Sequence, residues 1–364
     1  MQETDALRDA RRDMEICNAC RYCEGFCAVF PAMELRREFT SGDLAYLANL
    51  CHNCRGCYYA CQYAPPHEWG VNVPQHLAQV RAESYAEYAW PPALARAFQR
   101  NGLVVSVVTA AAFALVVALT AGLNGAAFTT PQDRFYQIIP LWVMQAAGLV
   151  TFIFSLAAIG IGTWRFWRVA GTGRRPDAGA LAVALHDVFT LRNLGGGGHG
   201  CNDNSERFSM LRRRLHHAMF YGFLLCFAAT CAGFVYHVFL DWPAPYPFLS
   251  APVLLGTIGG VSLMAGTFGL FAMKLLDDPG PAARELLGAD VALLVLLFLA
   301  AATGLALLGL RGSSAMGPAL AVHLGVILAL FLLLPYSKMV HGAYRAAALL
   351  RAAIERHEPP LGAE

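Results

Sequence analysis

Eight of the eleven cysteines lie in a short N-terminal stretch and form two copies of one pattern. Each copy reads C-x-x-C-x-x-C-x-x-x-C, and the second begins 34 residues after the first. Three cysteines at this spacing wrap a [4Fe–4S] cluster, and in two-cluster ferredoxins the fourth cysteine of each run ligates the other cluster. The pattern therefore predicts two [4Fe–4S] clusters, one on Cys17, Cys20, Cys23 and Cys61 and the other on Cys51, Cys54, Cys57 and Cys27.

Zinc and disulfides are the competing interpretations of this cysteine pattern. Zinc sites usually use well-separated C-x-x-C pairs, and disulfides do not suit the cytoplasm, where we expect this segment to lie. The runs also differ from two-cluster ferredoxins, in which proline directly follows the fourth cysteine, because Ala28 and Gln62 stand there. Residues 33–50, between the runs, have a helical pattern. We therefore predict a helical ferredoxin-like domain rather than the small βαββαβ fold.

Histidines near the ends of long apolar stretches are the second set of candidate ligands. Ionisable residues within or beside membrane spans are functional candidates by default. Two opposed imidazoles can hold haem b and leave no open iron position, which suits electron transfer rather than oxygen chemistry. We predict one or two haems b on His216, His237, His323 and His341, with His217 as the alternative to His216.

Membrane helices must position these histidines, and the composition indicates them. The chain is 57% hydrophobic and only 14% charged, against roughly 25% charged residues in soluble domains. About 20 apolar residues in a helix cross the hydrocarbon core of a bilayer. Six uncharged apolar stretches are long enough: 103–123, 138–162, 218–240, 251–273, 291–310 and 319–337.

Helical geometry tests how the histidines can pair. At about 100° per residue, His323 and His341 share one face if the last span continues as an interfacial helix. His216 and His237 are roughly 60° apart on one helix, whereas His217 and His237 are about 200° apart, which favours His216. Spans three and six run in opposite directions. His216 should therefore lie opposite His341, and His237 opposite His323.

Charge divides the chain and orients it. Residues 1–100 contain 22 of the 52 charged residues, so we predict a ferredoxin-type domain over 1–100, a membrane domain over 101–344 and a tail over 345–364. Loop 163–214 carries nine arginines, whereas loops 124–137 and 311–318 carry one each, Arg134 and Arg311. The positive-inside rule places loop 163–214 and both chain ends in the cytoplasm. No signal peptide is visible, and a net charge of +2 gives no reason to expect nucleic acid.

The other cysteines carry weaker signals. Cys226 and Cys231 fall inside a span and are predicted to pack as small apolar side chains. Cys201 follows a glycine run over 195–198 that lacks the Gly-Lys-Ser/Thr of a phosphate loop. We expect a flexible turn there rather than a contact to a partner or quinone.

Several segments resemble the tricarballylate/citrate-utilisation protein B family. They are CNACRYCEGFCAVFPAMELRREF, YLANLCHNCRGCYYACQYAPPHEW, HHAMFYGFLLCFAAT, PVLLGTIGG and PYSKMVHGAYR, and the resemblance covers nearly the whole chain. It implies a mainly α protein of the bacterial inner membrane, with iron–sulfur clusters and haem, that re-oxidises the reduced FAD of a tricarballylate dehydrogenase-like partner. The membrane half is also similar in plan to the dihaem cytochrome b subunits of respiratory nitrate reductases, which implies a six-helix cytochrome b-like bundle.

The main hypothesis is an electron-transfer component that passes electrons from a partner FAD-dependent dehydrogenase through the clusters and haem to quinone. No catalytic dyad, nucleophile or nucleotide motif indicates a substrate-oxidising site in this chain. We expect the donor to dock on an exposed surface at residues 52–59, and quinone to bind near His216, His217 and Arg212–Arg214. The alternative is a membrane subunit of a heterodisulfide or thiol reductase complex that takes electrons from quinol. A redox sensor or transporter is a weaker third hypothesis.

Overall fold

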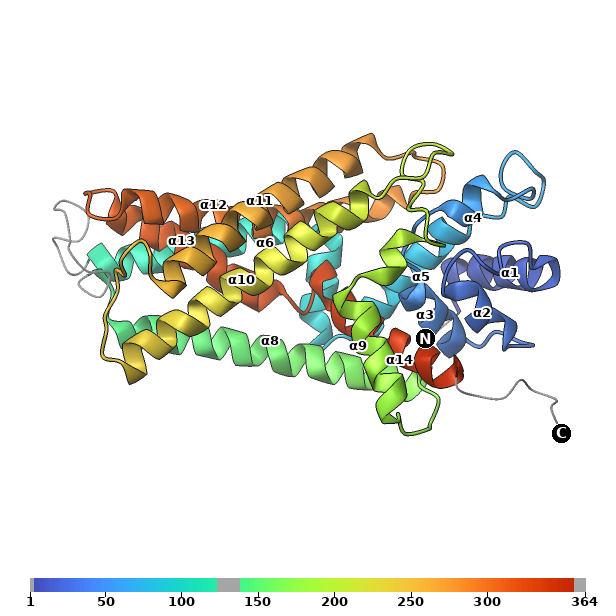
Figure 1. Cartoon of the computed structure of the whole chain (residues 1–364), viewed down its shortest axis with the longest axis horizontal. Coiled ribbons are helices and arrows are strands. Elements are labelled where there is room, and N and C mark those ends of the chain that lie inside the picture. Colours follow the sequence, from blue (N-terminus) through green and yellow to red (C-terminus); the bar gives the residue numbers. More distant parts are fainter. Residues whose placement is uncertain (1–2, 123–137, 357–364) are drawn as a thin grey trace.

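The computed structural model describes residues 3–122 and 138–356, and these residues are mainly helical. An isolated bridge between Cys201 and Ser209 is the one β-type pairing among them. Five helices form the N-terminal domain at one end of the molecule (Figure 1). They are α1 (Asp5–Cys20), α2 (Val29–Glu34), α3 (Ser41–Leu50), α4 (Gly56–Tyr59) and α5 (Val73–Tyr88). The structure therefore confirms the predicted helical ferredoxin-like domain.

Polar caps fix where the main N-terminal helices begin. The Thr4 hydroxyl accepts from the backbone N–H of Leu7 at the start of α1. Thr40 and Asp43 form a capping box that begins α3, and the Asn72 side chain caps α5. Each such cap satisfies backbone donors that the first helical turn leaves without partners.

Six long apolar helices form the second part of the chain, as predicted, and each is long and apolar enough to cross a membrane. Asn101 leaves helical geometry and kinks the first of them just before the predicted span begins at residue 103. The predicted loop 124–137, with Arg134, lies outside the described residues. The helices are α6 (Pro92–Gly122), α8 (Leu141–Ala170), α10 (Leu211–Phe239), α11 (Ala251–Leu276), α12 (Leu287–Leu310) and α13 (Met316–Leu333).

Glycines bring α10 and α11 unusually close together. A Cβ added at Gly222 would lie 2.6 Å from the backbone nitrogen of Leu263, and one at Gly266 would lie 2.4 Å from that of Met219. Small residues allow such backbone contact between membrane helices. The remaining close helix packing in the bundle runs from α11 through α12 and α13 to α6. α10 therefore meets the bundle chiefly through α11.

The last predicted span ends earlier than expected. α13 stops at Leu333, and a tight turn and the 3₁₀ helix η3 (Lys338–Val340) separate it from α14 (His341–Arg356). His323 and His341 therefore lie on different helices, and the angular argument for a shared helix face was wrong. The position of His341 is set by the start of α14, which turns toward the N-terminal domain (Figure 1).

α14 joins the membrane helices to the N-terminal domain. Its Tyr344 is buried and stacks on Phe166 of α8 with ring centres 5.1 Å apart. Near its end, the Glu355 carboxylate forms a salt bridge with Arg36 at 2.5 Å and accepts a hydrogen bond from the Tyr46 hydroxyl at 3.0 Å. Arg351 bridges Glu355 to Asp43, and all these side chains are largely buried. Breaking such a buried pair leaves an uncompensated charge, which costs about 3–5 kcal/mol.

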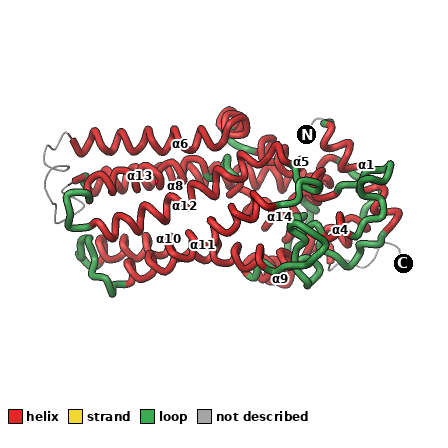
Figure 2. Tube along the Cα trace, turned by 90° about the horizontal axis from the view of Figure 1, so that it is seen from above, coloured by secondary structure: helices red, strands yellow, loops and turns green. Residues whose placement is uncertain are grey.

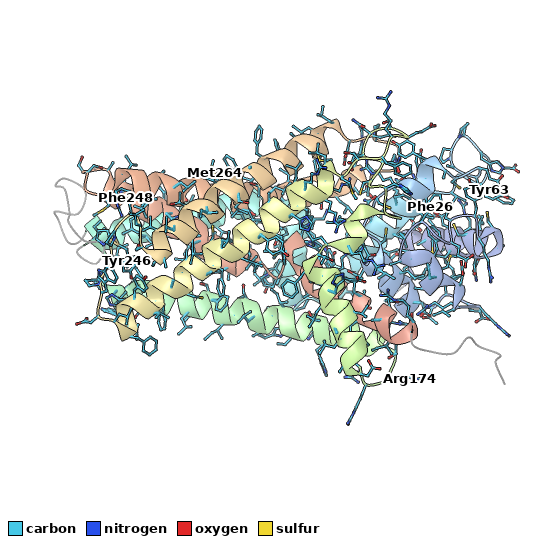
Figure 3. All side chains as sticks on the ribbon, viewed as in Figure 1. Phe26, Tyr63, Arg174, Tyr246, Phe248 and Met264 are labelled. Atoms are coloured by element: carbon cyan, nitrogen blue, oxygen red, sulfur yellow. The ribbon has the colours of Figure 1, made fainter. Side chains whose placement is uncertain are left out.

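The long loop between α8 and α10 also lies beside the N-terminal domain. It contains α9 (Ala178–Phe189), which packs on α14, and η1 (Arg192–Gly195). Figure 2 shows α9 and α14 at the same end of the bundle as α4 and α5. In Figure 3, Phe26 and Tyr63 lie at this end, and Tyr246 and Phe248 lie at the opposite end. The N-terminal domain, loop 163–214 and α14 therefore share one side of the six apolar helices.

Candidate functional site

Four cysteines surround a surface cavity in the N-terminal domain, and we call them the outer cysteine group. α1 carries two of them in its last turns, where Arg21 at φ 56° ends the helix and lets the chain fold back. The cavity has a volume of about 250 Å³ and is also lined by Cys57. Only Cys20 of this group is exposed. The outer cysteine group is Cys17, Cys20, Cys23 and Cys61.

The other four cysteines form the inner cysteine group, which is less accessible. The Cys27 thiol donates a hydrogen bond to the sulfur of Cys54, although these residues belong to different sequence runs. Both Cys51 and Cys54 are buried. The inner cysteine group is Cys27, Cys51, Cys54 and Cys57. The folded chain thus brings thiols of the two runs together, and the assignment of each set of four cysteines to one cluster stays a prediction.

The electrostatics of the thiols suit a bound cationic centre. Burial is the main cause that raises the pKa of Cys23 to about 12. Burial also raises the pKa of Cys57 well above its ordinary value. The hydrogen bond from Cys27 is the main cause that lowers the pKa of Cys54 to about 6. Iron binds the thiolate, so a cluster would supply the positive charge that these buried sulfurs otherwise lack.

The spacing of these thiols is also informative. A single zinc ion draws four cysteine sulfurs to about 2.3 Å from one point. Among the described residues, no three His, Cys, Asp or Glu side chains converge in that way. Two sets of four thiols, one of them around an open volume, are a donor set that suits iron–sulfur ligation.

The structure brings the imidazole rings of His216 and His341 close together in a tilted arrangement. Their ring centres lie 6.2 Å apart at an interplanar angle of 60°. Two metal–imidazole bonds of about 2 Å each, plus two ring radii of about 1.1 Å, place the ring centres of a bis-histidine site about 6 Å apart. Nδ1–H of His341 donates to the carbonyl oxygen of Lys338, so its Nε2 remains for a ligand. The pair therefore fits a haem iron between the rings.

His217 turns elsewhere. Its Nε2 lies 3.0 Å from the carbonyl oxygen of Thr190, and its ring stacks on Tyr221. These contacts hold the imidazole against the loop before η1. The geometry therefore favours His216 over His217 as the partner of His341.

The second predicted histidine pair lies toward the far end of the bundle. His237 stands near the end of α10, and His323 lies on α13. Nδ1 of His323 is 3.0 Å from the Thr303 hydroxyl, and a Cβ at Gly304 would lie 3.0 Å from the imidazole Cε1. Gly304 therefore leaves room for that ring, and haem ligation by this pair stays a prediction.

A buried bridge that sequence reasoning missed connects the inner cysteine group to His341. Arg345 donates to the carbonyl of Cys51 at 2.7 Å, and Arg81 donates to the same carbonyl at 2.7 Å. His52 lies beside them, and burial followed by the charge of Arg345 lowers its pKa well below the ordinary value. The same two causes lower the pKa of His341. Both imidazoles therefore stay neutral, which is the form that binds metal.

Residues 52–59 do not form the exposed docking surface that we expected. Two loops cover them. Arg55 is buried and bonds Asp203 and Asp277, and the Tyr59 hydroxyl bonds Asp278. The segment instead fastens the N-terminal domain to the membrane helices.

The glycine run also differs from the flexible turn that we expected. Gly197 lies against the backbone of Phe26, and Gly196 lies beside Cys54, which a Cβ at that position would approach to 3.7 Å. The backbone N–H of Asn202 donates to the carbonyl of Cys54 at 2.8 Å. The run therefore covers the inner cysteine group, and its small residues allow that close approach.

Comparison with known proteins agrees with this architecture. The family model described as Citrate utilization protein B matches residues 96–361, and that of its Fer4-like domain matches residues 10–87. The Citrate utilization protein B of Escherichia coli is 46% identical over 358 residues, which cover 97% of this chain and 93% of that protein. No solved structure matches the chain. The chain belongs to the citrate utilization protein B family, whose Fer4-like domain indicates an iron–sulfur electron-transfer role.

Proposed function

We propose that the protein carries electrons from the reduced FAD of a partner dehydrogenase to the quinone pool. The observation that carries this proposal is the order of the sites along the molecule. The outer cysteine group opens to the surface, the inner cysteine group is less accessible and includes the buried Cys51 and Cys54, and His52 and Arg345 connect it to His341 and His216. Such a series of one-electron sites is what transfer between a surface donor and a membrane acceptor requires.

The residues divide into three sets of ligands in this proposal. The outer and inner cysteine groups would each hold one [4Fe–4S] cluster, and His216 with His341 would hold haem b. His237 and His323 would hold a second haem b. When bound, these groups supply reversible one-electron chemistry. The surrounding chain buries Cys51 and Cys54 of the inner cysteine group and keeps His341 oriented through the Lys338 carbonyl.

The donor docks on the surface around the outer cysteine group. Cys20 is exposed there, and Tyr22 is 69% exposed and Trp69 is 44% exposed. Exposed aromatic side chains are enriched in protein interfaces. This face replaces residues 52–59 as the landing area for the partner. We propose that the partner is an FAD-dependent tricarballylate dehydrogenase or a relative of it.

The proposed orientation of the chain in the membrane rests on which elements lie at the same end of the helix bundle. The N-terminal domain, α9 and α14 lie together, and loop 163–214 carries nine arginines. The positive-inside rule favours the cytoplasmic side for this end. We propose a multi-pass protein of the bacterial inner membrane with both chain ends in the cytoplasm.

A measurement of electron transfer from the dehydrogenase through the haem to quinone tests this proposal directly. Mixing the purified full chain with a reduced FAD-dependent tricarballylate dehydrogenase should reduce the haem b, and added quinone should re-oxidise the haem. The visible absorbance spectrum of the haem follows both steps. The oxidised dehydrogenase serves as the control and should leave the spectrum unchanged. If quinol reduces the haem and the reduced dehydrogenase does not, electrons flow in the opposite direction. That result would favour a reductase subunit that takes electrons from quinol.

A further inference from the structure

We propose that quinone binds in the cavity between the N-terminal domain and the ends of α11 and α12. The cavity has a volume of about 600 Å³, within the range of about 300–1,000 Å³ typical of small-molecule sites. Its walls come from α5, the start of α6, the end of α11, the start of α12 and η3. The inference rests on the proposed function, because it names where the electron acceptor of that function binds.

The polar lining matches the chemistry of a quinone head group. A quinone has two carbonyl oxygens that accept hydrogen bonds and no polar hydrogen to donate. Tyr85 lines the cavity, and its hydroxyl is buried behind this wall with no hydrogen-bond partner among the described residues. The Lys338 ammonium also lines it and has three donors, one of which reaches Asp290 at 2.5 Å. The cavity therefore presents the Lys338 ammonium to a ligand with two acceptors, and the unpartnered Tyr85 hydroxyl lies just beneath the same wall.

A charge cluster keeps Lys338 in place. Asp290 forms salt bridges with both Lys338 and Lys274, so the sum of these three charges is positive. Arg81 adds another positive charge to the same wall. This positive charge stabilises the negative charge that develops on a quinone carbonyl oxygen when the quinone accepts electrons.

The apolar part of the cavity leads toward the lipid-facing surface. Phe98, Leu275 and Leu287 line it. Leu275 is 62% exposed, and the adjacent Leu276 is 72% exposed at the end of α11. An isoprenoid tail can lie along these leucines while the head group reaches the polar wall. Burial of the apolar surface of the tail and the leucines away from water lowers the free energy.

The cavity also lies next to the electron path. The carbonyl of Lys338 contacts Nδ1 of His341, and Arg81 contacts the carbonyl of Cys51. Reduction of one quinone to quinol takes two electrons, which the partner's reduced flavin supplies as it is oxidised. It also takes two protons, which cytoplasmic water supplies at the rim formed by Asp5, Asp9, Glu83 and Glu285.

At the position expected from the sequence most polar groups have partners, although Nε of Arg213 and Nδ1 of His216 are buried without one. Arg212 is held by Asp203 and Asn53, and Arg213 donates to the carbonyl of Thr190. The same carbonyl contacts His217. These side chains join elements of the fold to one another, whereas Tyr85 has no such partner.

Photolabelling of the full-length protein with an azido-quinone tests the site. Labelled peptides should contain residues 78–88 or 334–340, and excess quinone should suppress the labelling. Tyr85→Phe should weaken binding about ten-fold, which is the effect of one lost hydrogen bond, and Lys338→Met should weaken it further. The matched control Tyr221→Phe removes a hydroxyl outside the cavity and should bind normally.

Each outcome has one meaning. Labelling confined to other segments, or unchanged binding in Tyr85→Phe, overturns the site, as does loss of binding in Arg213→Gln alone. Because Tyr85→Phe removes one oxygen atom, its cofactor spectra should match the parent and show that the fold is intact. If the reduced dehydrogenase cannot reduce the haem while the cavity is still labelled, the proposed direction of electron flow fails and the quinone site stands.

Discussion

Replacement of His341 by alanine should eliminate the low-spin haem b signal that comes from the end of the bundle nearest the N-terminal domain. The 6.2 Å separation of the His216 and His341 rings leaves one iron ligand on each side, so either alanine variant removes half of the ligand pair. Loss of an outer-shell partner alone costs about 10–100-fold in metal affinity, so loss of the ligand itself should cost at least about 100-fold. A pyridine haemochrome assay and a visible spectrum of purified protein measure the result.

His217→Ala is the matched control for this prediction. His217 is the next residue on the same helix, but its imidazole contacts the carbonyl of Thr190. The control should keep the haem content of the parent. If His217→Ala loses the signal and both His216→Ala and His341→Ala keep it, the ligand assignment is wrong.

Cysteine replacements should separate the two clusters across the sequence runs. Cys54→Ser should remove about four irons and leave the outer cysteine group loaded, because Cys54 belongs to the inner cysteine group with Cys27. Cys61→Ser should instead resemble Cys20→Ser, although Cys61 belongs to the second run. In both cases the haem should be reduced at least about a hundred-fold more slowly by the dehydrogenase, because electron transfer requires closely spaced sites.

Electron paramagnetic resonance and iron analysis of the single variants distinguish the possibilities. Equal phenotypes for Cys61→Ser and Cys54→Ser, with a different phenotype for Cys20→Ser, would show that each run loads its own cluster. Cys231→Ser is the control, since this cysteine is exposed on α10 and belongs to neither cysteine group.

Local patterns made much of this architecture predictable. The doubled cysteine spacing indicates iron–sulfur chemistry because few other sites need four thiols within eleven residues. The six spans follow from length and lack of charge, and all six long helices are present. The pairing of His216 with His341 also agrees with the expectation, although the helix that was expected to carry His341 ends at Leu333.

Contacts between distant segments were not predictable in the same way. Arg345 belongs to no local motif that indicates a contact with the cysteines. In the structure it reaches the carbonyl of Cys51, some 294 positions away. The burial of residues 52–59 likewise depends on Asp203 and Asp277, which lie in two later loops. Such packing is set by tertiary structure, and no local spacing records it.

Cofactor content of the anaerobically purified chain tests the central claim most directly. Iron, acid-labile sulfide and haem should be measured on one sample, together with its electron paramagnetic resonance spectrum. Two [4Fe–4S] clusters predict about eight non-haem irons and about eight sulfides per chain, with one or two low-spin haems b. Zinc in place of iron, or a chain that contains no haem, would contradict the account.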